Sequence, residues 1–178
     1  MFSRTMTGIA ATAAIFAGTN AFAQGTEEST NRVAAKTDWS VFVENDPTEC
    51  WGVSSPKTTV NSRDGRTVSV QRGDILLFVT FRPGNGGKGE VSFTGGYPFA
   101  GGSTVTVAVG DSTFELFTEG EWSWPASAED DNKLVTALKR GSEAVLTARS
   151  SRGTQTKDTF SLMGFTAAME EAEKRCAQ

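Results

Sequence analysis

The sequence contains no histidine among its 178 residues and only two cysteines, Cys50 and Cys176. Histidine is the commonest general base and a frequent zinc ligand, so its absence removes the most familiar catalytic and metal-site arrangements. Two isolated cysteines cannot complete a zinc site, and they do not form the Cys-x-x-Cys pattern of redox enzymes. The chain also lacks a Gly-x-Ser-x-Gly motif and a phosphate-binding glycine loop. We therefore expect no enzymatic activity, no cofactor and no bound metal ion.

Long apolar runs are also scarce, and the longest one after the N-terminal region is only Ile75-Leu76-Leu77-Phe78-Val79, too short to span a bilayer. The N-terminal region itself has the order of a signal peptide. Arg4 precedes a short apolar stretch over residues 8–18, and Ala21-Phe22-Ala23 has the small-x-small pattern of a cleavage site. We predict a signal peptide over residues 1–23, a flexible polar tether over residues 24–36 and one domain over residues 37–178. The expected location is the periplasm, with secretion or attachment to the outer surface as alternatives.

An exported protein with two cysteines, one near each end of the mature domain, favours a disulfide between Cys50 and Cys176. A second argument comes from the C-terminal segment. Phe165, Met169, Ala172 and Cys176 recur at spacings of four, three and four, which places them on one face of a helix. Cys176 is therefore expected to point inward, toward the strand that begins at Cys50.

Most of the chain consists of short segments with alternating apolar and polar residues, separated by Gly, Asp, Asn and Pro turns. This pattern predicts a mainly β fold, a single antiparallel β-sandwich or barrel-like domain. Two helices interrupt it, one at about residues 128–140 and one at about residues 164–176. Ser127 is a suitable N-cap for the first, since Glu129, Asp130 and Asp131 follow it at the positive end of the helix dipole.

The charge balance is acidic, with 21 acidic against 17 basic residues. Removal of Arg4 with the signal peptide would leave a mature charge of about −5, which disfavours nucleic-acid binding and uniform attraction to anionic membranes. Basic residues gather locally at Lys139-Arg140, Arg149 and Arg152. A solvated face and an anionic ligand explain this clustering equally well.

Aromatic residues in loops are the strongest candidates for binding, because they offer large contact area at small entropic cost. Tyr97 and Phe99 lie in a glycine-flanked loop, and Trp122 and Trp124 precede the first helix. Packing in the core is the alternative role for each of them.

Two other patterns have simpler explanations than function. Glu119 and Glu121 flank Trp122 in a way that suggests a sugar-cleaving carboxylate pair, but alternating acids are common on surfaces. Arg72-Gly73-Asp74 spells the tripeptide associated with integrin binding, but it directly precedes an apolar strand, where glycine simply makes a turn.

Several motifs together resemble the invasion-associated locus B (IalB) family of exported alphaproteobacterial proteins. The order and spacing that carry the resemblance are Trp39 followed by Cys50, the strand over residues 74–81 running into Pro83-Gly84, the helix over residues 132–141, and the closing stretch over residues 160–168. The resemblance implies a β-sandwich or barrel-like domain with short helices, secreted or periplasmic and without an established enzymatic activity. Many members carry a second cysteine pair where this chain has Phe117 and Trp122, so we expect an aromatic contact to replace that crosslink.

These observations predict a non-enzymatic exported binding protein of the periplasm or cell surface, whose partner is an envelope or surface protein. The alternative is a periplasmic binder of a small molecule, lipid or glycan. The sequence does not indicate the oligomeric state or the identity of the partner.

Overall fold

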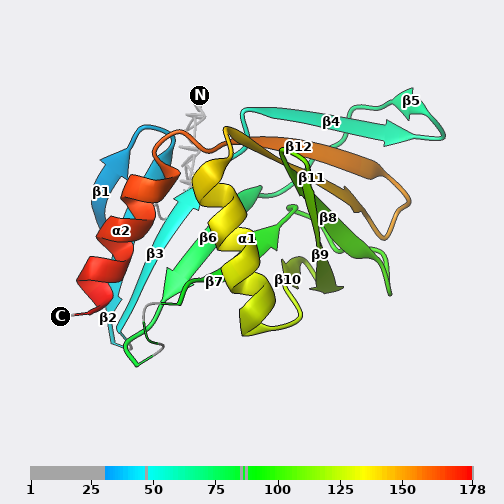
Figure 1. The fold of residues 1–178 in the computed structure, drawn as a ribbon. Helices are drawn as coiled ribbons and strands as arrows, with labels where there is room; N and C mark the ends of the chain where they lie inside the picture. Colours follow the sequence, from blue (N-terminus) through cyan, green and yellow to red (C-terminus); the bar gives the residue numbers. More distant parts are fainter. Residues whose placement is uncertain (1–30, 47, 85, 87, 178) are drawn as a thin grey trace, which may run out of the picture.

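The computed structural model describes residues 31–46, 48–84, 86 and 88–177. The predicted signal peptide lies outside the described residues. Within them the chain forms twelve strands and two helices (Figure 1). The strands are β1 (Arg32–Lys36), β2 (Trp39–Asn45), β3 (Thr48–Ser54), β4 (Thr58–Arg63), β5 (Arg66–Thr67), β6 (Leu76–Phe81), β7 (Glu90–Thr94), β8 (Thr104–Val109), β9 (Ser112–Glu119), β10 (Trp122–Trp124), β11 (Glu143–Arg149) and β12 (Gln155–Ser161). The helices are α1 (Ala128–Arg140) and α2 (Phe165–Cys176).

All twelve strands belong to one sheet with the order β1-β2-β3-β6-β7-β10-β9-β8-β11-β12-β4-β5. Every neighbouring pair is antiparallel, as expected for a chain with short connections. The sheet has two edges, β1 and β5, so it is not a closed barrel. It bends over itself, because the rings of Phe93 on β7 and Phe160 on β12 meet with centroids 6.1 Å apart although four strands separate them in the sheet. The prediction of a mainly β, antiparallel fold is confirmed.

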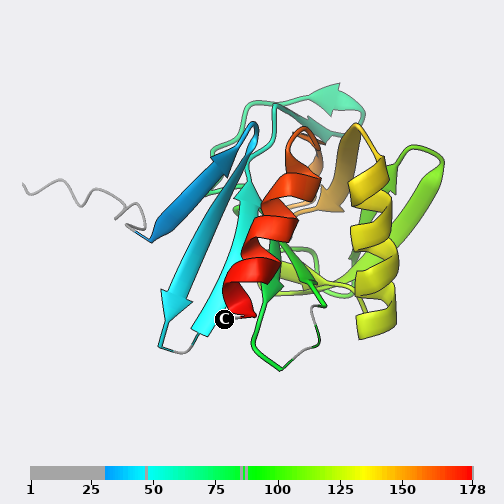
Figure 2. The ribbon, with the colours of Figure 1, turned by 60° about the vertical axis from the view of Figure 1, so that its left-hand side comes forward.

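The core lies on the inner face of this bent sheet. Alternate residues of each strand point into it, such as Val105, Val107 and Val109 on β8. Both helices lie on this side (Figure 2), with α2 against β1, β2, β3 and β6, and α1 against β7. Helix α2 approaches β3 closely because Gly52 has no side chain, and a Cβ atom there would collide with the end of Met169.

Both helices begin and end close to their predicted positions. At the start of α1 the backbone N–H of Asp130 donates to the hydroxyl of Ser127 at 3.2 Å, so the predicted N-cap is confirmed. Gly164 precedes α2 with a φ of 88°, a left-handed conformation that disfavours residues with a side chain. A Cβ at Gly164 would also collide with the carbonyl oxygen of Lys36, so glycine is needed where α2 starts beside β1.

The structure contains the predicted disulfide between Cys50 on β3 and Cys176 at the end of α2. The two cysteines are 126 positions apart in the chain, and their Cα atoms are 5.7 Å apart. The predicted inward stripe of α2 is buried throughout, including Met169 and Ala172. The bond therefore joins the C-terminal helix to the sheet from within the core.

One boundary differs from the sequence prediction. Residues 32–36, expected to be part of the flexible tether, form the edge strand β1, in which Ala34, Ala35 and Lys36 pair with Val41, Ser40 and Trp39 of β2, respectively. Neither described helix is long and apolar enough to cross a membrane.

Candidate functional site

The outer face of the sheet carries a row of aromatic side chains that come from five strands, β2, β3, β6, β9 and β10. Residues directly opposite each other on paired strands point to the same side, so the register assigns this face without ambiguity. Phe42 pairs with Trp51, and Trp124 pairs with Phe117. We call this row the outer aromatic surface; its members are Phe42, Trp51, Phe78, Phe117, Trp122 and Trp124.

The rings of the outer aromatic surface contact one another in pairs. Phe42 and Trp51 are stacked with an interplanar angle of 7° and centroids 5.7 Å apart. Phe78 on β6 lies 5.8 Å from Trp122 on β10, across the intervening strand β7. These contacts hold the side chains in fixed positions, so the surface presents rigid apolar area.

Solvent reaches much of this surface. Phe117 is 47% exposed and Trp122 is 41% exposed, and the other four rings are partly exposed. Both described helices pack on the opposite face, because α2 contacts the strands through its buried stripe against inward residues such as Trp39. Exposed aromatic residues gathered on one face of a sheet are unusual on a monomer and typical of an interaction surface.

Carboxylates accompany the aromatic rings on the same face. Positions two residues away along the strands point to the same side, which places Glu44 beside Phe42, Glu49 beside Trp51, and Glu115 and Glu119 beside Phe117. Arg82 binds Glu49, with Nε 2.6 Å from the carboxylate, and also contacts Glu90. Arg32, which pairs with Phe42, adds a second positive charge. The acidic groups outnumber these two arginines, so the surroundings of the aromatic rings carry a negative net charge.

Of the four binding residues predicted from the sequence, two belong to the outer aromatic surface and two do not. Trp122 and Trp124 lie on β10 and contribute to it. Phe99 is only 6% exposed and packs against Phe93 in the core. Tyr97 is half-buried and packs edge-on against Phe99, with centroids 5.2 Å apart. A single patch of all four residues therefore does not form.

The expected contact between Phe117 and Trp122 is also absent from the ring contacts of the described residues. Phe117 instead pairs directly with Trp124, with centroids 5.7 Å apart, while Trp122 turns toward Phe78. The register of β9 and β10 explains this, because Trp122 is opposite Glu119. An aromatic pair does connect β9 and β10, but Phe117 forms it with Trp124, two residues after Trp122.

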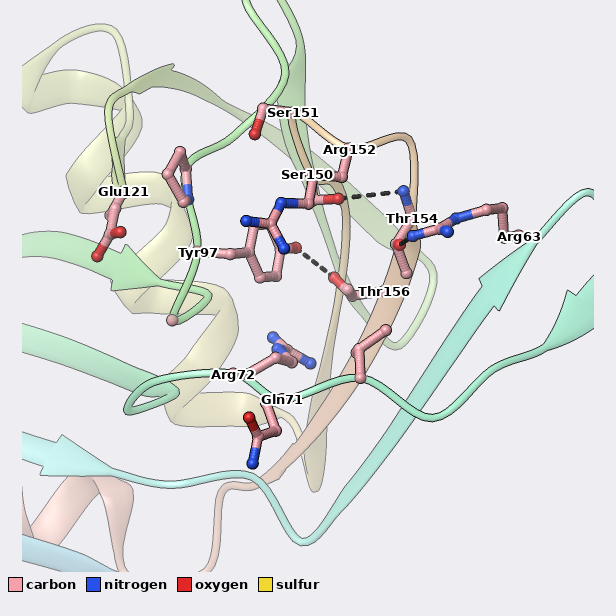
Figure 3. A pocket seen from close by; sticks show the side chains of 13 residues that line it. Arg63, Gln71, Arg72, Tyr97, Glu121, Ser150, Ser151, Arg152, Thr154 and Thr156 are labelled. Carbon is pink, nitrogen blue, oxygen red and sulfur yellow. Dashed lines mark hydrogen bonds between the residues drawn. The ribbon is translucent and has the colours of Figure 1, made fainter.

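A separate cleft of about 550 Å³ lies beside Tyr97 (Figure 3). Its walls come from the end of β4, the connection before β6, the loop after β7, and the turn between β11 and β12. The lining includes three arginines, Arg63, Arg72 and Arg152. It also includes one glutamate, Glu121, and the hydroxyl groups of Tyr97, Ser150, Ser151, Thr154 and Thr156.

A buried ion pair borders this cleft through Arg72, which belongs to the lining. Both Nη atoms of Arg72 donate to the carboxylate of Asp158, at 2.8 and 2.6 Å, and the two side chains are 6% and 0% exposed. Nε of Arg72 donates to the carbonyl of Gly95 at 2.8 Å, and its guanidinium carbon lies 5.0 Å from the centroid of Tyr97. Arg72 is thus held inside the domain, and the Arg-Gly-Asp tripeptide serves the fold.

Tyr97 takes part in the same network. Its hydroxyl lies 2.5 Å from the hydroxyl of Thr156. Burial raises the pKa of Tyr97, while the hydrogen bond with Thr156 and the charge of Arg72 oppose this change. The phenol therefore stays protonated at neutral pH and offers the cleft a neutral hydroxyl group.

The proposed carboxylate pair is divided between the two sites. Glu119 belongs to the outer face of β9, whereas Glu121 lines the cleft. Among the described residues, no group of three or more histidine, cysteine, aspartate or glutamate side chains is arranged to hold a metal ion. The outer face offers apolar contact area, and the cleft offers hydroxyl and guanidinium groups.

Sequence reasoning missed four of the six outer aromatic residues and the Arg72–Asp158 pair. Phe42, Trp51 and Phe78 appear in the sequence as ordinary apolar positions of predicted strands, and only their alternation with buried neighbours such as Val41 marks them as outward. Asp158 could have been noticed, because it occupies an inward position of β12 between Thr156 and Phe160.

Comparisons with known proteins were consistent with this fold. A family model described as invasion associated locus B (IalB) protein matches residues 71–173, which is more than half of the chain. The crystal structure of invasion associated protein B from Bartonella henselae is similar, with a TM-score of 0.55 and 17% sequence identity, over 78% of this chain and 94% of that chain. At this identity the structural likeness supports the fold alone. No curated protein matches the sequence.

Proposed function

Because the chain belongs to the invasion associated locus B family, we propose that it acts as an exported, non-enzymatic binding protein of the periplasm or cell surface. Its outer aromatic surface contacts an envelope or surface protein. The observation that carries this proposal is the row of six aromatic side chains on a sheet face that neither described helix covers. Tryptophan and other aromatic residues supply most of the binding energy in many protein interfaces.

The charges around the surface specify the chemistry of the partner. Glu44, Glu115 and Glu119 surround apolar rings, so a complementary partner presents apolar side chains flanked by lysine or arginine. Such a partner would be attracted over a distance of several ångströms, and salt would slow its association. An anionic lipid surface would be repelled by the same carboxylates.

Export is supported by the order of charge, apolar stretch and cleavage site in residues 4–23. The disulfide between Cys50 and Cys176 supports it as well, because such bonds persist in oxidising compartments. A binding role without catalysis is supported by the lack of histidine and of any recognised nucleophile motif in the sequence.

The test is capture from intact envelopes with the mature protein carrying a photo-crosslinker at Thr104, which pairs with Phe117 at the border of the surface. Wild type is compared with Phe117→Thr/Trp122→Thr, in which β-branched residues keep the strand propensity but remove the rings. The matched control is Met163→Thr, since Met163 is 64% exposed and lies outside the surface.

We expect one basic, apolar-rich partner to crosslink to wild type and to the control, and recovery to fall at least tenfold with the double variant. Recovery should also fall as salt rises, because the carboxylates contribute to the encounter. Equal recovery with all three proteins would contradict the proposal, provided that circular dichroism shows the double variant to be folded.

A further inference from the structure

We propose that the cleft beside Tyr97 binds a small polar ligand through an anionic phosphate or carboxylate group, held by Arg63 and Arg152. This site is distinct from the outer aromatic surface. The cleft volume of about 550 Å³ lies within the range of pockets that hold ligands the size of one or two sugar rings.

The two arginines differ from Arg72 because neither has a carboxylate partner among the described residues. Arg63 lies at the end of β4 and donates from Nη2 to the hydroxyl of Thr154 at 2.7 Å, which positions its guanidinium over the cleft (Figure 3). Arg152 lies in the turn between β11 and β12, where it is exposed and makes no hydrogen bond or ion pair within the described part of the chain. Two guanidinium groups at one cleft thus retain N–H donors for a ligand.

The buried pair below them makes the cleft suitable for an anion. Asp158 would repel a negative ligand, but Arg72 binds both oxygens of its carboxylate, so the charges of Arg72 and Asp158 cancel. Glu121 is the one acidic residue in the lining. The net charge of the cleft is therefore positive, although the net charge of the whole protein is negative. A positive cleft concentrates small anions.

Hydroxyl groups complete the site and favour a polar ligand over an apolar one. The hydroxyls of Tyr97 and Thr156 lie in the wall, and Ser150 accepts a hydrogen bond from the backbone N–H of Thr154 at 3.1 Å. These groups are fixed by their neighbours, so they can exchange hydrogen bonds with a ligand at little entropic cost. Guanidinium groups match the geometry of phosphate and carboxylate oxygens, which explains the choice of anion.

The experiment is an NMR titration of the ¹⁵N-labelled mature protein with three matched sugars: glucose 1-phosphate, glucuronate and glucose. They share a ring and differ in carrying a phosphate, a carboxylate or no charge. We expect saturable shifts for at least one of the charged sugars, confined to amides of residues 150–156, 96–98 and 63, and no saturation with glucose. The comparison of the first two ligands distinguishes phosphate from carboxylate.

The variant Arg63→Gln/Arg152→Gln should weaken binding of the charged sugar at least tenfold, because both positive charges and both bidentate guanidinium groups are removed. The matched control is Lys139→Gln/Arg140→Gln, which removes two exposed charges at the end of α1 and should bind as wild type does. Equal weakening in both variants, unchanged binding in the first, or no saturation by either charged sugar would overturn the proposal. None of these outcomes affects capture through Phe117 and Trp122, so the proposal for the cleft and the proposal for the outer aromatic surface are tested independently.

Discussion

Opening the bond between Cys50 and Cys176 should lower the stability of this domain more than any single side-chain change on its surface. The bond closes a loop between two cysteines that are 126 positions apart in the sequence. In the chain-entropy model, a crosslink over a loop of that length stabilises the folded state by roughly 5 kcal/mol, because it restricts the unfolded chain. Measured values for native disulfides are often smaller, so we expect a loss of about 2–5 kcal/mol.

Urea unfolding followed by tryptophan fluorescence measures this loss. With a slope of about 1–3 kcal/mol per molar urea, a loss of roughly 4 kcal/mol moves the midpoint down by about 2 M. Reduced wild type is the main comparison, since it keeps both buried sulfur atoms and lacks only the crosslink. The variant Cys50→Ala/Cys176→Ala should be less stable still, because it also leaves two small cavities in the core.

Reduction should also change the slope of the urea dependence. An unfolded chain freed from the crosslink is more expanded, so the reduced protein should show a steeper dependence on urea than the oxidised protein. If the free energies of unfolding of the reduced and oxidised proteins agree within about 1 kcal/mol, the bond does not stabilise the fold and the prediction is refuted.

Two further predictions concern the buried carboxylate of Asp158 and the partly buried carboxylate of Asp131. Asp158→Ala leaves the Arg72 guanidinium buried without its partner and should cost about 3–5 kcal/mol in urea unfolding, whereas Arg72→Met/Asp158→Leu should recover part of that loss; a cost below about 1 kcal/mol for the single change would contradict the buried pair. Burial raises the pKa of Asp131 above its ordinary 3.8, so the folded state binds a proton at this carboxylate more tightly than the unfolded chain does. The stability that this proton contributes is fully present below pH 3.8 and is lost as pH rises through the folded pKa. Asp131→Asn keeps an acceptor for the N–H of Val91, 2.8 Å away, and should therefore be more stable than wild type at pH 7, with an advantage that disappears near pH 3; an advantage independent of pH would refute this assignment.

The parts of the fold that could be predicted from the sequence are those that short-range chemistry determines. The cap at Ser127, the acidic first turn after it and the spacing that buries Cys176 all act within one helix, and each was predicted correctly. The disulfide followed, because two cysteines and one inward stripe left a single pairing. Strand β1 was missed because an edge strand of five residues has little apolar character to distinguish it from a tether.

The candidate sites depend on register between distant strands, which the sequence does not display. Trp122 meets Phe78 only because β10 inserts between β7 and β9 in the sheet. Arg72 and Asp158 are 86 positions apart, and nothing in the pattern around either one identifies the other as its partner. Phe99 was expected in a loop exposed to solvent, but its loop turns back over the sheet and pairs with Ser150. Of the four aromatic residues chosen from the sequence, Trp122 and Trp124 therefore lie on the outer aromatic surface, whereas Tyr97 and Phe99 pack against each other beside the core.

The bond between Cys50 and Cys176 also makes the backbone between them a closed covalent ring. The whole segment matched by the family model, residues 71–173, lies inside this ring. A single proteolytic cut within it, such as one after the exposed Lys88 between β6 and β7, produces two new chain ends but no separate fragments. The two pieces would stay covalently joined through the disulfide after such a cut, and a reductant would be needed to break this link.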